Sequence, residues 1–116
     1  MSDVVWKLVD RAEWDASGET YGGSAVDRAD GFIHLSTTDQ LAETAARHYR
    51  GEVDLLLLSV DLSGLRETVK WEASRSGALF PHIHGDLPRS AVLARRSLSV
   101  DGDGVMRFDD GGVGWP

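Results

Sequence analysis

One short stretch decides the fold of this 116-residue chain: Asp54-Leu55-Leu56-Leu57-Leu58-Ser59-Val60. Its apolar run has no alternating polar positions and is far shorter than the ~20 residues that a membrane-spanning helix needs. A strand that is covered on both faces has this pattern, because neither set of alternate side chains meets water. The sequence therefore predicts a central strand that forms the core of the protein.

The segments around this strand predict further helices and strands. Residues 4–9 form a β-branched and aromatic opening strand, after which Asp10 and Glu13 predict the start of a short helix. Residues 38–49 predict a helix, because Thr37 and Gln40 form a capping box. Its buried stripe is expected to consist of Leu41, Ala42, Ala45, Ala46 and Tyr49.

Three more strands are expected, at residues 68–73, 91–100 and 105–108, the last two joined by a hairpin turn at 101–104. Helices placed among several short strands indicate an α+β domain. We expect a single domain over residues 1–108, followed by a flexible Gly-rich tail at 109–116 in which Trp115 is the residue able to dock.

Composition limits the partners. Nineteen Asp and Glu residues against twelve Lys and Arg give a formal net charge of −7 at pH 7. Nucleic acid is disfavoured, since phosphate binding relies on a basic surface, and a small-molecule ligand is expected instead. There is no cysteine, which excludes disulfides and thiolate ligands and fits a reducing compartment. With no signal-peptide pattern or membrane span, the expected location is the cytoplasm; the oligomeric state is left open.

The segment Gly31-Phe32-Ile33-His34-Leu35-Ser36 is the first candidate for a functional site. In an extended strand Ile33 and Leu35 point to one face, while Phe32, His34 and Ser36 point to the other. A histidine beside a hydroxyl thus faces away from the aliphatic layer. Upstream, Tyr21 lies among glycines on a loop or short strand, where it either packs or forms the wall of a ligand site.

Two later segments add polar groups. In the strand at 68–73, Lys70 and Glu72 share the face opposite Trp71, so Glu72 is either a solvated surface residue or a site carboxylate. The segment Phe80-Pro81-His82-Ile83-His84-Gly85 contains a proline and is expected to be a loop or an edge strand. His82 and His84 project together in extended backbone, and with His34 or Glu72 they offer ligands for a divalent metal ion.

Taken in order, these motifs resemble the bacterial family called domain of unknown function 952. The resemblance is carried by "DGFIHLST" at 30–37, Gln40, the leucine strand, "VKWE" at 69–72 and "FPHIHG" at 80–85. It runs from about Trp6 to about Leu98, with His84 where the family pattern has tyrosine. The family fold is similar to that of ADP-ribosyltransferases. The resemblance therefore implies two small mixed or antiparallel sheets that form a cleft, flanked by a few helices.

The same resemblance implies roles for individual residues. His34 and Ser36 would hold the nicotinamide-side ribose of NAD, and Glu72 would stabilise the positive charge that develops when the glycosidic bond breaks. The aromatic that stacks on nicotinamide would be Tyr21 or Tyr49. The expected ligand contacts are Tyr21, Phe32, Trp71, Phe80, His82 and His84.

Three functions are expected, the first of them implied by the family resemblance. The first is binding of NAD or a related ribosyl ligand, with ADP-ribosyl transfer or glycosidic cleavage at His34, Ser36 and Glu72. The second is a non-catalytic small-molecule binding module with the same cleft. The third is a metal site formed by histidines and a carboxylate.

Overall fold

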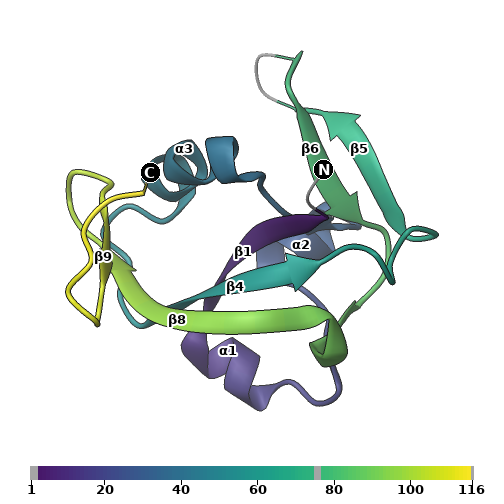
Figure 1. Ribbon diagram of the computed structural model, residues 1–116, viewed down its shortest axis with the longest axis horizontal. Coiled ribbons are helices and arrows are strands. Elements are labelled where there is room, and N and C mark those ends of the chain that lie inside the picture. The colour runs from purple at the N-terminus through teal and green to yellow at the C-terminus, as the bar shows by residue number, and fades with distance from the viewer. Residues whose placement is uncertain (1–2, 75–76, 116) are drawn as a thin grey trace.

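The computed structural model describes residues 3–74 and 77–115. Its largest sheet is four-stranded and antiparallel, in the order β1-β4-β8-β9 (Figure 1). The strands are β1 (Val4–Asp10), β4 (Leu55–Asp61), β8 (Val92–Val100) and β9 (Met106–Phe108). The predicted central strand is confirmed, because β4 pairs with β1 on one side and β8 on the other.

The side chains of β4 enter two separate apolar clusters, one on each face of this sheet. Leu56 and Leu58 belong to a cluster that also contains Trp14 of α1 (Arg11–Ala16). Leu55 and Leu57 belong to the other cluster, together with side chains of α3 (Thr38–His48) and β9. Figure 1 shows α1 and α3 on opposite sides of the sheet. Coverage of both faces explains why the strand has no polar alternation.

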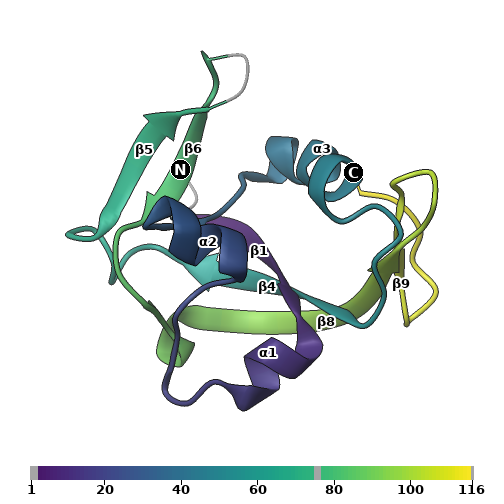
Figure 2. The same cartoon turned by 180° about the vertical axis from the view of Figure 1, so that it is seen from behind.

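The remaining strands form two smaller antiparallel sheets. One is three-stranded, in the order β3-β6-β5, with β3 (Ile33–His34), β6 (Leu79–Ile83) and β5 (Val69–Ala73). The other pairs β2 (Thr20–Tyr21) with β7 (Leu87–Pro88), and a short 3₁₀ helix, η2 (Arg89–Ala91), precedes β8. The β5–β6 hairpin rises away from the large sheet (Figures 1 and 2). The α+β class is therefore confirmed, but the described residues form three small antiparallel sheets where two were expected.

A backbone bridge between Trp6 and Ser36 joins the large sheet to the three-stranded one. The amide of Trp6 donates to the Ser36 carbonyl at 2.8 Å, and the amide of Ser36 donates to the Trp6 carbonyl at 2.9 Å. The segment that carries His34 is thus held between β1 and β6, where the two sheets meet.

The prediction that the Phe80–Gly85 segment is a loop or an edge strand was wrong. It contains β6, the middle strand of its sheet, with Pro81 opposite Trp71 of β5. The Pro81 carbonyl accepts from the Leu35 amide at 3.0 Å, on the side of β3. The missing N–H of a proline faces the same side as its carbonyl, and it falls just beyond the end of β3 at His34. A central strand tolerates the proline because its neighbour is only two residues long.

The capping signals at 10–13 and 37–40 predicted two helix starts correctly. The Asp10 side chain accepts from the Glu13 amide at the start of α1, and Gln40 accepts from the Thr37 amide at the start of α3, each at 3.0 Å. Gln40 has a second role, because its Nε2 donates to the Leu79 carbonyl at 2.7 Å and ties α3 to the hairpin.

A third helix, α2 (Ala25–Asp30), was not predicted. It begins with a capping box in which the Ser24 hydroxyl accepts from the Asp27 amide at 3.2 Å and the Asp27 carboxylate accepts from the Ser24 amide at 2.9 Å. Gly22 and Gly23 obscured this signal, since glycines usually mark irregular backbone. The helix is central to the site described below.

In the C-terminal segment, Trp115 docks as the sequence allowed. Its ring packs edge-on against Trp6, with centroids 4.9 Å apart, and its Nε1 donates to the Thr38 carbonyl at 2.9 Å. Flexibility of 109–116 and a domain limit at 108 stay predictions, and Pro116 lies outside the described residues. Of the helices in residues 3–74 and 77–115, none has the length and apolar character needed to cross a membrane.

Candidate functional site

A cleft of about 570 Å³ lies where the two larger sheets meet. Its walls come from β1, α2, α3, β6 and the segment from His34 to Ser36. Figure 2 shows α2 in front of β1, α3 above β1, and the β5–β6 hairpin beside α2. The cleft therefore receives side chains from segments that are far apart in the sequence.

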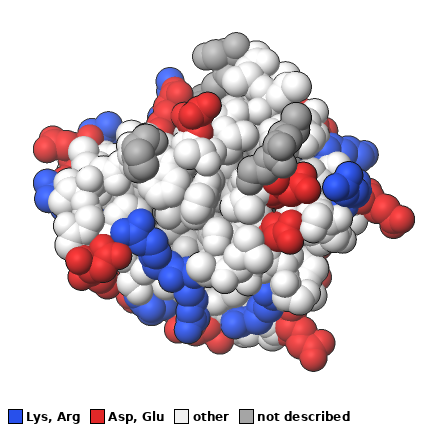
Figure 3. Space-filling view, in the orientation of Figure 1, with Lys and Arg blue, Asp and Glu red and all other residues white. Residues whose placement is uncertain are grey.

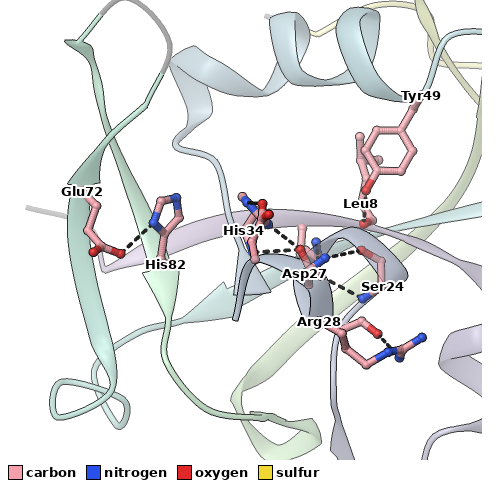
Figure 4. A network of polar contacts seen from close by, with 11 residues as sticks. Leu8, Ser24, Asp27, Arg28, His34, Tyr49, Glu72 and His82 are labelled. Atoms are coloured by element: carbon pink, nitrogen blue, oxygen red, sulfur yellow. Dashed lines mark hydrogen bonds and ion pairs between the residues drawn. The ribbon is translucent and has the colours of Figure 1, made fainter. Parts of the chain in front are cut away.

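A buried carboxylate, Asp27, is the anchor of this cleft. Its Oδ1 lies 2.6 Å from Nδ1 of His34 (Figure 4). Its Oδ2 lies 2.9 Å from Nζ of Lys7. The side chains of Asp27 and Lys7 are only 2% and 4% exposed. The backbone amide of His34 also donates to Oδ1, at 3.2 Å. Asp27 thus links β1, α2 and β3 through a single side chain.

Gly23 allows Asp27 to take this position. The glycine has φ +101°, and a Cβ built on it would lie 2.7 Å from the Cβ of Asp27. Real side chains do not approach so closely, so any larger residue would displace α2 or its carboxylate.

Electrostatics keep Asp27 ionised. Burial by itself raises the pKa of this carboxyl. The hydrogen bond from His34 and the positive charge of Lys7 lower the pKa by more than burial raises it, so the pKa lies well below the ordinary value. Burial also lowers the pKa of Lys7, against the opposing attraction of Asp27. The two residues form a buried ion pair, and removal of one partner would leave the charge of the other buried and unpaired.

His34 stands between two carboxylates. Its Nδ1 meets Asp27, and its Nε2 lies 3.0 Å from Oδ2 of Asp30, which is half exposed on the last turn of α2. Carboxylates accept hydrogen bonds, so both contacts exist together only when both ring nitrogens carry a proton. The ring itself is 35% exposed, in contrast to the fully buried Ile33 and Leu35 on either side. The buried Asp27 therefore fixes the orientation of the His34 ring, and the ring remains accessible from the cleft.

A second group of histidines lies beside His34. Oε1 of Glu72 is 2.9 Å from Nδ1 of His82 and 2.7 Å from Nε2 of His84. These hydrogen bonds, that of His84 first, lower the pKa of Glu72. The ring of Phe32 stacks on His82, with centroids 4.1 Å apart and planes 20° apart, and His82 meets His34 edge-on at 5.3 Å.

The structure brings most of the predicted site residues together. His34, Ser36, Phe80 and His82 line the cleft. Phe32 packs against His34, His82 and His84 from outside the lining. Glu72 is also off the lining and is hydrogen-bonded to His82, which lines the cleft (Figure 4). The Ser36 hydroxyl is 3.0 Å from Oγ1 of Thr44 on α3.

Two predicted ligand contacts lie elsewhere. Tyr21 is 3% exposed in the apolar cluster and packs against Trp14, with ring centroids 5.6 Å apart. Trp71 is 49% exposed on the hairpin and does not line the cleft. Tyr49 does line it, and its hydroxyl donates to the Leu8 carbonyl at 3.1 Å. Of the two candidates for a stacking aromatic, only Tyr49 is placed to meet a ligand in this cleft.

Sequence reasoning missed Asp27, Asp30 and Lys7. One signal was present for Lys7, because it alternates with Val5 and Val9 on the apolar face of the opening strand. A lysine there has to find a buried partner. The spacing of Ser24 and Asp27 was a second signal, since it matches a capping box.

The metal alternative gains no support from the geometry. In the ranges 3–74 and 77–115, no group of three or more His, Asp or Glu side chains is arranged to hold a metal ion. His82 and His84 do project together, as expected, but both point at one oxygen of Glu72.

The surface in Figure 3 carries both signs of charge, with no broad basic area on that face.

These features define a small α+β protein with a histidine–carboxylate cleft between two antiparallel sheets. The chain belongs to the family described as protein of unknown function (DUF952), whose model matches residues 8–95. The match confirms the family resemblance seen in the sequence motifs.

Solved structures of a relative agree with this membership. The crystal structure of protein CC0527 from Caulobacter crescentus is 49% identical, with a TM-score of 0.84 over 90% of this chain and 93% of that chain. The solution NMR structure of the same protein gives a TM-score of 0.76 at 49% identity, over 88% and 90% of the two chains. Comparison with curated proteins gives no match.

Proposed function

We propose that this protein binds a nicotinamide nucleotide or a related ribosyl ligand in the cleft, and that its sheets follow an ADP-ribosyltransferase-like arrangement. The observation that supports this proposal is the convergence of His34, Ser36 and His82 on one cleft, with Glu72 hydrogen-bonded to His82. In the proposed complex a ribose hydroxyl replaces the exposed Asp30 carboxylate at Nε2 of His34 and accepts its hydrogen bond. Asp27 fixes the ring of His34, so that it does not have to be ordered when the ligand binds.

The chemistry open to such a site is cleavage of the nicotinamide–ribose bond. As this bond breaks, its electron pair leaves with nicotinamide, and positive charge develops on the anomeric carbon and the ring oxygen of the ribose. An acceptor, water or another hydroxyl-bearing nucleophile, then forms the new bond to that carbon and releases its proton to solvent. A nearby carboxylate stabilises the charged state. Glu72, acting across His82, and Asp30, beside His34 on the lining, are the carboxylates that we propose for this role.

A second function, a non-catalytic binding module, is favoured by the position of Glu72. Its side chain is off the lining, and its Oε1 is engaged by both His82 and His84. A carboxylate held in this way contributes to the shape of the site without meeting the reacting carbon. The cleft and the Asp27–His34 pair would then be retained for recognition alone.

Thermal-shift titration with nicotinamide riboside, nicotinamide mononucleotide and NAD tests the binding proposal. At least one compound should raise the melting temperature of the wild type and fail to do so for His34→Ala. His84→Ala is the matched control, because it removes a histidine that does not line the cleft and should keep the response. If no compound shifts the wild type, or if both variants respond equally, the proposed cleft function is wrong.

Nicotinamide release separates the enzyme from the binding module. Glu72→Gln keeps an oxygen that can accept from His82 but removes the negative charge. Turnover in the wild type that is lost in Glu72→Gln, with binding retained, would support the enzyme. Binding without release in either protein would support the module.

A further inference from the structure

The outer edge of the β5–β6 hairpin is an open sheet edge. β5 is the last strand in the order β3-β6-β5, and Figures 1 and 2 show its outer side facing away from the large sheet. An uncovered edge strand presents amides and carbonyls that can extend the sheet by pairing with a strand of another chain. The edge of β5 is therefore a candidate surface for contact between protein chains.

The hydrogen bonds at the two ends of the hairpin show which backbone groups face this edge. The Ser74 amide donates to the Ala78 carbonyl at 2.9 Å, and the His84 amide donates to the Thr68 carbonyl at 2.7 Å. Residues along an antiparallel strand bond alternately to one side and to the other. The even-numbered residues of β5 therefore bond to β6, and the odd-numbered ones, with Trp71 in the middle, turn their amides and carbonyls to the open edge.

The open part of the edge is the segment from Lys70 to Ala73. At its beginning the amide of Val69 is already engaged, because it donates to the Leu65 carbonyl at 3.0 Å. The segment contains no proline and pairs with β6 in an unbroken register. Prolines and bulges are common features that block an edge, so the backbone of this one is able to pair.

The side chains of this segment form an apolar face and a charged face. Trp71, Ala73 and the neighbouring Leu79 of β6 share one face, on which Trp71 is 49% and Leu79 is 54% exposed. Lys70 and Glu72 share the other face. Glu72 uses Oε1 for both of its histidine contacts, and Lys70 is exposed and forms no ion pair with a residue in 3–74 or 77–115. A strand with the opposite order of charges would complement both faces.

We propose that this edge pairs with the same edge of a second copy of the chain, antiparallel and centred on Trp71. A two-fold axis at this position places Trp71 opposite itself, in a pair that exchanges both backbone hydrogen bonds. Lys70 of each chain then lies opposite Glu72 of the other, in a non-hydrogen-bonded pair whose Cα atoms are about 4.5 Å apart. The dimer has ion pairs on one face and paired tryptophans on the other.

The charges select this register over its neighbours. A slip of two residues is the smallest that keeps outward-facing backbone groups opposite each other, and it places either Lys70 opposite Lys70 or Glu72 opposite Glu72. Like charges directly opposite are destabilising. The register centred on Trp71 is thus the self-complementary one. Because the paired segment is short, we expect a dimer of low affinity whose population depends on protein concentration.

Sedimentation equilibrium of the full chain, from micromolar to millimolar concentration, tests the proposal. The mean mass of the wild type should rise from 12.6 kDa toward twice that value. Lys70→Glu places like charges opposite each other and should weaken dimerisation roughly 10-fold. Arg95→Glu is the matched control, because it makes the same change of charge at an exposed position on β8, and it should keep the dimer.

Mixing two charge variants tests the register itself. Glu72→Lys alone should also lose the dimer, since Lys70 then meets a lysine. A mixture of Lys70→Glu with Glu72→Lys restores opposite charges in both pairs and should associate about as well as the wild type. Such a rescue has no explanation in misfolding of either variant.

Trp71→Ala tests the apolar face without touching the histidine contacts of Glu72. It should weaken dimerisation several-fold, because the paired rings are lost. Leu93→Ala, at an exposed apolar position on β8, is its control and should not.

Three results would overturn the proposal. The first is a wild type that stays monomeric at millimolar concentration. The second is a dimer that Lys70→Glu and Arg95→Glu weaken equally, which would place the interface elsewhere. The third is a mixture of the two folded charge variants that does not associate.

Discussion

Nδ1 of His34 lies 2.6 Å from Oδ1 of Asp27, and this contact joins an open cleft to the interior of the protein. The carboxylate is 2% exposed, whereas the imidazole is 35% exposed. On its interior side Asp27 is held by Lys7 and by the start of α2. The position of His34 is therefore fixed by the fold and does not depend on a ligand.

The buried pair of Asp27 and Lys7 leads to a stability prediction. Asp27→Asn should lower the free energy of unfolding by about 3–5 kcal/mol, because Lys7 is left buried without a counter-charge. The double variant Lys7→Met/Asp27→Asn should recover most of this loss, since no unpaired charge remains. Urea unfolding of the three proteins measures both effects. A double variant as unstable as Asp27→Asn would contradict the account.

The lowered pKa of Asp27 leads to a prediction about pH. In the unfolded chain this carboxyl has the ordinary value of 3.8, and folding lowers it. Between the two pKa values the unfolded chain binds a proton that the folded protein excludes, so stability falls as pH falls. The contribution is fully present above about pH 4 and is lost as pH drops through the lowered pKa. Urea midpoints measured from neutral to acid pH should fall less steeply for Asp27→Asn than for the wild type. The control Asp103→Asn removes an exposed carboxylate, and its midpoints should fall as steeply as those of the wild type.

His34→Ala should separate binding from stability. The side chain is partly exposed, so its loss should cost about 1–2 kcal/mol, mostly from the hydrogen bond to Asp27. Ile33→Ala, one residue earlier on the buried face, should cost about 3–4 kcal/mol through the cavity it leaves. Denaturant unfolding of both variants gives the comparison. A loss at His34 as large as that at Ile33 would identify it as a core residue.

The hydrogen bonds of Glu72 to His82 and His84 should be detectable in the ¹⁵N NMR shifts of the two imidazole rings. In the wild type, its carboxylate should hold the proton of His82 on Nδ1 and that of His84 on Nε2. Glu72→Ala should change the ring ¹⁵N shifts of both histidines and leave those of His48, on α3, as an internal reference. Equal ring spectra in wild type and variant would show that these hydrogen bonds do not form in solution.

Features that depend on neighbouring residues could be predicted from the sequence, and those that depend on distant pairing could not. The starts of α1 and α3 follow from local capping residues, and β4 follows from an unbroken apolar run. Pro81 in a central strand is acceptable only because β3 is short, which no local pattern reveals.

The candidate site divides in the same way. Alternation placed His34 opposite Ile33 and Leu35, and this was correct. Its partner Asp27 comes from a helix whose capping signal was hidden among glycines, and the contact with Lys7 joins strand to helix across 20 positions. Such contacts arise from tertiary packing, so the sequence shows the group that faces the cleft but not the groups that orient it.

The central claim, that the cleft around His34 is a ligand site, is tested most directly by a backbone ¹H–¹⁵N NMR titration of the wild type with nicotinamide riboside. The account predicts saturable shifts that are largest at Asp27, His34, Thr44 and His82, which line the cleft from α2, β3, α3 and β6. Shifts that are largest at residues away from this cleft, or no shift at millimolar ligand, would contradict it.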